Sequence, residues 1–360
     1  MTLYAALDLH ANNNYLVVID EQDQVVYRRK QANELGPLLR VLEPFRQQLV
    51  GLVVESTYNW YWLVDGLMEA GWKVHLANTA GAEQYAGLKH SNDWTDAHWL
   101  AHLLRLGILP EGYIYPKAQR AVRDLLRERF RLVQERSRQI IGIEGIFARQ
   151  RGVALSGRRI GELDGPELEK RFSEEPLVRQ AVEARLGVLG ALQTQISRLE
   201  ETVTQHVEGQ PDYERLQTVW GVGKVLSRTI LLETGPINRF AQQGDYLSYC
   251  RMVESRKWSN GKKKGENNRK CGNRYLGWAF MEAAHFAGRY YPPAQAFVDR
   301  KTVQGHRVLG LKALASKLCR ASYFVLRDQV EFDPKRVFGS TGGSRPESRP
   351  IRVGPQSRQI

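Results

Sequence analysis

The apolar positions of the first hundred residues change repeatedly between the spacing of strands and the spacing of helices. Leu3–Leu9, Tyr15–Asp20 and Gln24–Arg29 are short apolar runs bounded by polar turns, which is typical of three strands in a meander. The pattern then predicts a helix over 34–48, a strand ending at Glu55, a helix over 59–70 stopped by Gly71, a strand over 73–77 and a helix beginning near 93. This order is that of the RNase H-like fold, so we predict an α/β domain of that class over residues 1–115.

From about Lys117 the apolar residues recur at helical spacing between Arg-rich faces, which predicts a helical region over 116–207. A break rich in glycine and charge, 151–167, divides two long helices. In the second helix a heptad seam steps by three and four, through Leu189, Leu192, Ile196, Leu199 and Val203. This seam fits an antiparallel helical hairpin or a dimerising coiled coil, and because it covers only about two heptads it also fits an ordinary core face.

Residues 208–333 are predicted to form a third, mainly α-helical domain, with helices over 275–290 and 312–330. Beyond Asp333 the chain is rich in Gly, Ser, Pro and Arg and carries 6 Lys+Arg against 1 Glu. We expect this basic tail, 334–360, to be disordered.

The charge of the chain is divided unevenly along its length. The net charge is +13, but residues 1–115 carry 13 Asp+Glu against 8 Lys+Arg, so the remainder is strongly basic. An acidic first domain followed by a basic body suits an enzyme that holds a polyanion with one part and cuts it with another.

The composition also favours a cytosolic protein. Three widely spaced cysteines show no Cys-x-x-Cys spacing and are expected to be reduced thiols. No signal peptide and no apolar stretch of about 18 residues is evident, so no membrane partner is expected.

Four carboxylates are the main candidates for chemistry: Asp8 inside the first strand, Glu55 at the end of the fourth, and Asp93 and Asp96 three apart at a helix start. Taken singly, each also fits a turn, a cap or a favourable charge at a helix N-terminus. Together they could hold two Mg²⁺ (or Mn²⁺) ions about 4 Å apart, the arrangement that drives phosphodiester cleavage in many nucleases.

Two glycines mark a second candidate, in the run Trp220-Gly221-Val222-Gly223-Lys224. A Gly-Val-Gly turn between helices is typical of a helix-hairpin-helix, in which Gly221, Gly223 and Lys224 would hold a nucleic-acid phosphate. A simple turn between helices is the competing interpretation.

A basic polar loop is the third candidate. Residues 251–274 hold 9 Lys+Arg against 2 Glu, interleaved with Ser, Asn and Gly, which predicts contact with a phosphate backbone. The expected binding residues are Arg256, Lys257, Lys262, Lys263, Lys264, Arg269 and Lys270. Ser259 lies among these cations, so it is either a nucleophile or a serine that merely contacts phosphate.

These motifs resemble a known family. Ala-Leu-Asp8-Leu-His, Val-Val-Glu55-Ser and Asn-Asp93-Trp-Thr-Asp96-Ala look like the DEDD motif of the RuvC-like domain in bacterial insertion-sequence transposases of the "one-ten" family. Trp220-Gly-Val-Gly, Ser259-Asn-Gly-Lys-Lys-Lys-Gly and Gly-Asn273-Arg-Tyr-Leu look like its second conserved domain, closest to the "eleven-eleven" subgroup. The resemblance spans roughly residues 1–330.

The resemblance implies a DNA recombinase that acts on element ends and target, with the four acids holding Mg²⁺ and Ser259 forming a covalent link to DNA. It further implies guidance by a structured RNA. Ser255 is the nearest rival to Ser259, but the Asn-Gly that follows makes Ser259 the better match. One departure is Trp94, where many relatives have a basic residue, and it puts that residue's nucleic-acid contacts in doubt.

The predicted function is therefore an RNA-guided DNA transposase acting as a homodimer or higher homo-oligomer. One alternative is a Holliday-junction resolvase-like nuclease that uses the same acids with water as nucleophile. The other is a non-catalytic nucleic-acid-binding protein, which would have no need of an acidic constellation.

Overall fold

The computed structural model describes residues 1–82, 92–253, 257–260, 262–265, 271–303 and 306–339. The chain divides into two compact units, one of residues 1–117 with 255–271, and one of residues 118–254 with 272–360.

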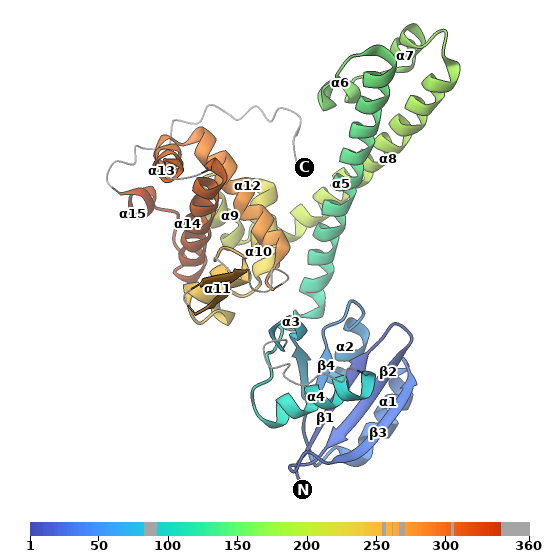
Figure 1. Ribbon diagram of the computed structural model, residues 1–360, viewed down its shortest axis with the longest axis vertical. Coiled ribbons are helices and arrows are strands. Elements are labelled where there is room, and N and C mark those ends of the chain that lie inside the picture. Colours follow the sequence, from blue (N-terminus) through green and yellow to red (C-terminus); the bar gives the residue numbers. More distant parts are fainter. Residues whose placement is uncertain (83–91, 254–256, 261, 266–270, 304–305, 340–360) are drawn as a thin grey trace. The chain divides into compact units, whose positions relative to one another are not determined.

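The first unit is built on a five-stranded mixed sheet with the order β3-β2-β1-β4-β5 (Figure 1). Its strands are β1 (Leu3–Leu9), β2 (Asn13–Ile19), β3 (Val25–Ala32), β4 (Leu49–Glu55) and β5 (Val74–Ala77). β1, β2 and β3 pair antiparallel, whereas β4 runs parallel to β1 and to β5. The strand order is the one expected for an RNase H-like fold, and the α/β start of the chain is confirmed.

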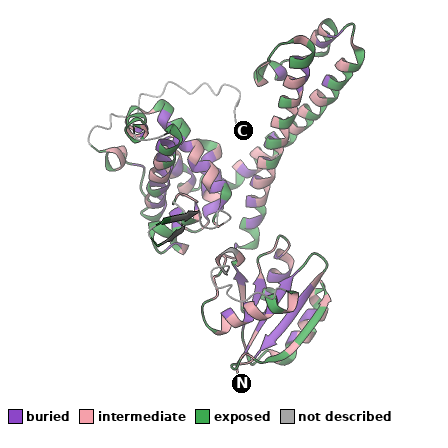
Figure 2. Cartoon of the chain, viewed as in Figure 1, coloured by how far each residue is buried: buried purple, intermediate pink, exposed green. Residues whose placement is uncertain are grey.

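The pleat of β1 and β4 divides their side chains between two cores. Leu7 and Val54 face a cluster formed with the helices α1 (Leu35–Leu42) and α2 (Tyr61–Glu69). Ala6 and Val53 face the opposite cluster, which is completed by α4 (Asp93–Arg105). Because both faces are covered, β1 is buried along nearly its whole length, and β4 is buried from Gly51 to Val54 (Figure 2).

Two local predictions for this unit need correction. The helix expected over 34–48 is shorter, because α1 ends at Leu42 and the 3-10 turn η1 (Glu43–Phe45) follows, with Pro44 in its first turn. β2 begins at Asn13 rather than Tyr15, since Asn13 pairs with Ala32 of β3. Here strand pairing overrides the turn preference of asparagine. A short helix, α3 (Thr79–Ala82), follows β5.

Two long helices begin the second unit, α5 (Lys117–Arg151) and α8 (Pro176–Val207). Arg129 contacts Glu200, Arg136 contacts Gln193, and Arg185 contacts Gln139. As the residue number increases along α5, the number of the contacting residue on α8 decreases. The two helices therefore pair antiparallel within one chain. This pairing corresponds to the hairpin alternative, while pairing with a second copy remains a prediction.

The segment between the two helices, expected to be a break, holds the short helices α6 (Gly157–Gly161) and α7 (Gly165–Arg171). They close an apolar cluster with the end of α5 and the start of α8, around Phe147, Phe172 and Val182. On the seam of α8, Ile196 and Val203 are buried, whereas Leu189, Leu192 and Leu199 are only partly so.

The rest of the second unit is helical, as predicted. Its elements are α9 (Pro211–Thr218), α10 (Lys224–Thr234), η3 (Ile237–Arg239), α11 (Gln243–Tyr249), α12 (Arg274–Tyr290), α13 (Pro292–Thr302), α14 (Arg307–Arg327) and α15 (Pro334–Phe338). The inner faces of α12 and α14 form the centre of one large core. Across the described parts of the chain, no helix is both long and apolar enough to cross a membrane.

The residues just after Asp333 are helical, which corrects the expectation that the tail is disordered from 334. Asp333 caps α15 by accepting a hydrogen bond from the backbone N–H of Lys335. Phe338 stacks on Trp220, with ring centroids 5.3 Å apart. Packing on the core therefore orders this short helix, and residues 340–360 lie outside the described residues.

Candidate active site

The two strand acids are neighbours on one face of the sheet. Leu7 of β1 pairs in parallel with Val54 of β4, so Asp8 and Glu55 follow at the same level of adjacent strands. By the alternation of the pleat they point, with Ala6 and Val53, to the face that α4 covers. Asp8 is only 4% exposed. A carboxylate buried to this extent requires compensation, which a cation can supply.

The helical pair is positioned by the start of α4. The side chain of Asn92 accepts hydrogen bonds from the backbone N–H groups of Trp94 and Thr95, and the hydroxyl of Thr95 accepts one from the N–H of Asn92. This capping box fixes the first turn. Asp93 and Asp96 lie in that turn, while Ala97 and Leu100 bind the helix to the sheet.

Trp94, the departure from the family pattern, packs on the sheet. Its ring meets Tyr15 edge to face at 4.9 Å, and the guanidinium of Arg28 lies 5.6 Å from its centroid. The indole thus helps to seat the turn that carries the acids.

Electrostatic coupling joins three of the acids. Burial raises the pKa of Glu55 to about 8, with further contributions from a hydrogen bond to Asp8, the charge of Asp8 and the charge of Asp96. The hydrogen bond to Asp8 and the charges of the two aspartates disfavour the ionised form of Glu55. The site therefore holds more negative charge than its surroundings neutralise, which is the condition that favours a divalent ion.

His10 connects the fourth acid to this group. Its Nδ1 lies 3.7 Å from Oδ2 of Asp8, and its Nε2 lies 3.4 Å from Oδ1 of Asp93. Ligand atoms of Asp8, His10 and Asp93 all lie within 4.8 Å of one another. The sequence prediction missed His10. Its position could have indicated a role beside Asp8, because residues two apart in an extended chain point to the same face.

All four predicted acids thus gather at one end of β1 and β4, although 88 positions separate Asp8 from Asp96 in the sequence. Carboxylate oxygens are hard ligands suited to Mg²⁺ and Mn²⁺. The donor set fits a divalent metal centre.

The predicted basic loop contains a short antiparallel hairpin, β6 (Lys257–Ser259) and β7 (Lys262–Gly265). The backbone of Ser259 pairs with Lys262, which puts the serine beside the turn, where Asn260 has φ of 51°. Asn260 and Lys262 are exposed. The remaining predicted residues, or their side chains, lie outside the described residues: Arg256, Lys257, Ser259, Lys263, Lys264, Arg269 and Lys270.

The two chain segments that flank this loop are joined at its base. The N–H of Asn273 donates to the carbonyl of Tyr249 at 2.6 Å, and Nε of Arg251 donates to the carbonyl of Gly272 at 3.1 Å. Gly272 has φ of +82°, and a Cβ there would lie 2.7 Å from the Tyr249 oxygen, so only glycine fits. The backbone just before the loop is therefore hydrogen-bonded to the backbone just after it.

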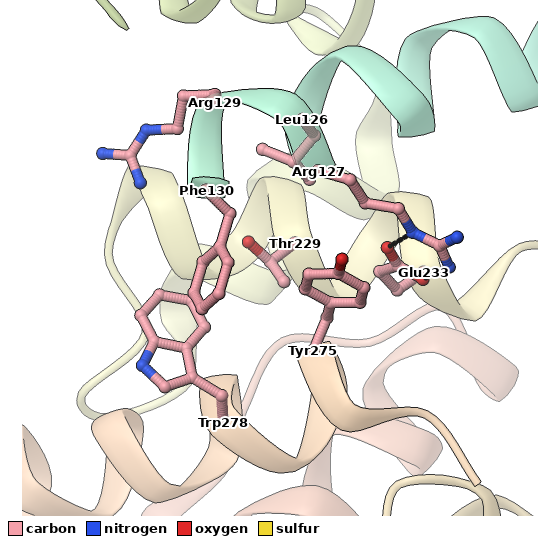
Figure 3. A pocket seen from close by; sticks show the side chains of 8 residues that line it. All are labelled: Leu126, Arg127, Arg129, Phe130, Thr229, Glu233, Tyr275 and Trp278. Carbon is pink, nitrogen blue, oxygen red and sulfur yellow. Dashed lines mark hydrogen bonds and ion pairs between the residues drawn. The ribbon is translucent and has the colours of Figure 1, made fainter. Parts of the chain in front are cut away.

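Asn273 extends this anchor into the core of the second unit. Its side chain caps α12 by accepting from Tyr275 and Leu276, and it donates to Oε2 of Glu233 at 2.6 Å. Glu233 also accepts two hydrogen bonds from Arg127 of α5, at 2.6 and 2.7 Å. Figure 3 shows this ion pair in a small pocket lined by Leu126, Arg127, Arg129, Phe130, Thr229, Glu233, Tyr275 and Trp278.

The Gly-Val-Gly turn joins α9 to α10, as predicted. Gly221 has φ of +82°, and a Cβ would lie 2.1 Å from the carbonyl oxygen of Ala283, so this glycine permits close packing on α12. Gly223 is exposed and precedes α10 with no side-chain cap, and Lys224 is exposed at the first position of the helix. The N-terminus of α10 is accessible to an anion.

Comparison with known proteins finds transposase matches in both halves of the chain. A transposase model of the IS110 type, named for the DEDD motif, matches residues 5–149. The model of the transposase IS116/IS110/IS902 family matches residues 213–299. The chain belongs to the IS110 family of transposases.

A probable family 20 transposase of Pseudomonas aeruginosa is 26% identical over 274 residues, covering 72% of this chain and 76% of that protein. An IS110-family transposase acts on DNA, and the DEDD type implies use of a divalent metal. The matched ranges contain the four acids, the Gly-Val-Gly turn and Ser259.

Proposed function

We propose that this IS110-family transposase is an RNA-guided DNA recombinase with an RNase H-like metal centre made by Asp8, Glu55, Asp93 and Asp96 and a nucleophile at Ser259. The observation that carries the proposal is the convergence of the four acids on one face of the sheet, at the ends of β1 and β4 and the start of α4. A protein that only binds nucleic acid has no use for this concentration of uncompensated charge.

The acids have distinct tasks in this proposal. Asp8, rigid and buried on β1, and Glu55 beside it would share an ion. Asp93 and Asp96, on one turn of α4, would complete its shell or hold a second ion. The bound Mg²⁺ or Mn²⁺ supplies Lewis-acid stabilisation of the charge that develops on the phosphate. Glu55 must give up its proton for the site to be filled.

Ser259 would supply the attacking oxygen. Its hydroxyl would lose its proton and form a bond to phosphorus, while the bond to the deoxyribose oxygen breaks and that oxygen takes up a proton. The phosphoserine link would conserve the bond energy for rejoining strands. The position beside the hairpin turn and the adjoining Lys262 support this role, because a cation there stabilises the additional negative charge. The anchor at Asn273 would fix where the loop is presented.

The nucleic-acid surface would comprise the basic hairpin and the accessible N-terminus of α10, where Gly223 and Lys224 would act as part of a helix-hairpin-helix. Element ends, target DNA and a structured guide RNA are its proposed partners. We propose that Ser259 and the acids meet across a protomer interface, with a homodimer as the minimum unit.

The decisive experiment looks for a protein–DNA adduct. Wild-type protein with Mg²⁺, cognate DNA and guide RNA should become covalently attached to a DNA strand, and Ser259→Ala should not, although its binding of DNA should persist. Mixing Ser259→Ala with Asp8→Asn should restore some activity if one site is shared between protomers.

The other outcomes separate the competing functions. Cleavage that depends on the acids but leaves free ends and no adduct would identify a resolvase-like nuclease with water as nucleophile. Binding without any cleavage, in the presence of Mg²⁺ or Mn²⁺, would identify a non-catalytic nucleic-acid-binding protein.

A further inference from the structure

We propose that His10 is a metal ligand of this centre, a nitrogen donor beside Asp8 and Asp93, and that it gives the site a preference for Mn²⁺ over Mg²⁺. This inference rests on the proposed metal role of the acids and adds a residue outside the DEDD set.

The geometry that supports it is the place of the imidazole between two carboxylates. The ring nitrogens lie 3.7 Å from Asp8 and 3.4 Å from Asp93, on the side of the sheet that the acids share. Two ligands of one small divalent ion, each bound at about 2.1 Å, lie at most about 4.2 Å apart. The ligand atoms of the three residues already lie within 4.8 Å of one another, so small side-chain rotations suffice to close the shell.

The position of His10 is fixed by its backbone and its ring. Its N–H donates to the carbonyl of Asn13 at 2.9 Å, and its own carbonyl accepts from the side chains of Asn33 and Asn59 at 2.9 and 3.0 Å. Its ring meets Tyr15 at 5.5 Å, close to edge on. A ligand held in this way loses little conformational entropy when the ion binds.

A histidine elsewhere in the same unit shows the contrast. His102 contacts Asp23 at 2.9 Å, but Arg105 also lies 3.3 Å from that carboxylate and already neutralises it. His10 instead lies beside two acids of a cluster in which burial and neighbouring charges raise the pKa of Glu55.

The chemistry of the donor sets the preference. Mg²⁺ binds oxygen almost exclusively, whereas first-row divalent transition ions accept imidazole nitrogen more readily, and Mn²⁺ is the one among them most like Mg²⁺. A single nitrogen among carboxylates therefore favours Mn²⁺ without excluding Mg²⁺.

Electron spin-echo spectroscopy of bound Mn²⁺ tests the proposal directly. Wild-type protein loaded with Mn²⁺ should show the modulation of one directly coordinated histidine nitrogen, and its frequencies should change when the protein is made with ¹⁵N-labelled histidine. His10→Ala and His10→Asn should lose this modulation. They should also weaken Mn²⁺ binding by about 10- to 100-fold, with a smaller change for Mg²⁺.

His102→Ala is the matched control and should keep both the modulation and the affinity. Because His10 has a side chain that is 42% exposed, its variants should fold, which a thermal melt verifies. Tight Mn²⁺ binding that requires Asp8 but shows no histidine nitrogen would overturn the role of His10 and leave the acids in place. Absence of Mn²⁺ binding in the wild type, or binding unaffected by Asp8→Asn, would overturn the metal role of the acids as well.

Discussion

Arg127 on α5 and Glu233 on α10 form a two-pronged ion pair in which the carboxylate is 1% exposed, and the same carboxylate accepts a hydrogen bond from Asn273 at the end of the Ser259 loop. One buried acid thus joins the long helix, the helix after the Gly-Val-Gly turn and the anchor of the basic hairpin. Burial lowers the pKa of Arg127, but the hydrogen bond and charge of Glu233 outweigh this effect and raise it.

We expect Arg127→Ala to lower the free energy of unfolding by about 3–5 kcal/mol, because it removes two hydrogen bonds and one positive charge from the buried Glu233 carboxylate. Chemical denaturation measures the loss. Arg131→Ala is the control on the same helix: its partner, Glu128, is one helical turn away, and its side chain is 61% exposed, so a loss below about 1 kcal/mol is expected. Equal losses in both variants would show that the buried ion pair stabilises the fold no more than the exposed pair does.

Replacing Asp8 tests the metal centre. Asp8→Asn removes the charge with little change in volume, so the fold should persist while Mg²⁺-dependent strand cleavage falls at least ~100-fold. A cleavage assay on cognate DNA, with and without EDTA, gives the measurement. Asp65→Asn, on α2 of the same unit, is a control for the loss of one negative charge. Full activity of Asp8→Asn, or full activity in EDTA, contradicts the proposed site.

The raised pKa of Glu55 makes metal binding depend on pH. Below about 8 the metal-free protein holds a proton on Glu55 that the ion must displace, so affinity for Mg²⁺ should rise from about pH 6 to 8 and level off above. Titration calorimetry in buffers of different ionisation enthalpy counts the released protons. Glu55→Gln should lower the number of protons released on metal binding and weaken this pH dependence, and an unchanged dependence in that variant would assign it to another group.

The same shift affects folding without metal. The folded state holds the Glu55 proton more tightly than the unfolded chain, whose carboxyl has the ordinary pKa of 4.5. This contribution to stability is present below pH 4.5 and is lost as pH rises through about 8. In EDTA, the melting temperature of the wild type should therefore fall more between pH 4.5 and 8 than that of Glu55→Gln. Added Mg²⁺ should offset this fall in the wild type.

The lysines of the basic hairpin should set the salt dependence of binding. Replacing Lys262, Lys263 and Lys264 with Gln should reduce the slope of log K against log salt by about 0.9 for each phosphate of duplex DNA that the variant no longer neutralises. Fluorescence anisotropy over a salt series measures the slope. An unchanged slope would direct attention to the exposed arginines of α5, such as Arg131 and Arg138.

The two glycines of the turn should behave differently. Gly221→Ala forces a Cβ against the Ala283 oxygen in a left-handed backbone conformation and should cost about 1–3 kcal/mol or more. A Cβ at Gly223 meets nothing within 4 Å, so Gly223→Ala should fold normally and can report on phosphate binding alone. Equal destabilisation by Gly221→Ala and Gly223→Ala would contradict the packing of Gly221 against Ala283.

The sequence by itself determined the elements and the candidate chemistry. Near-continuous apolar runs give β1 and β4 their two buried faces, and Asn92 followed by Thr95 sets the start of α4, because these effects act over a few neighbouring residues. The four acids could be identified as candidate metal ligands from their positions in these predicted elements. Their carboxylate groups already indicate a hard divalent ion.

Tertiary structure alone decided how these pieces meet. The parallel register of β1 and β4 brings Glu55 beside Asp8, and the packing of α4 brings Asp93 to His10. Packing also extends β2 into an asparagine turn, orders α15 against Trp220 and joins Glu233 to both Arg127 and Asn273. Each outcome depends on contacts between residues distant in the chain, whose free energy exceeds the local preference of the residues involved.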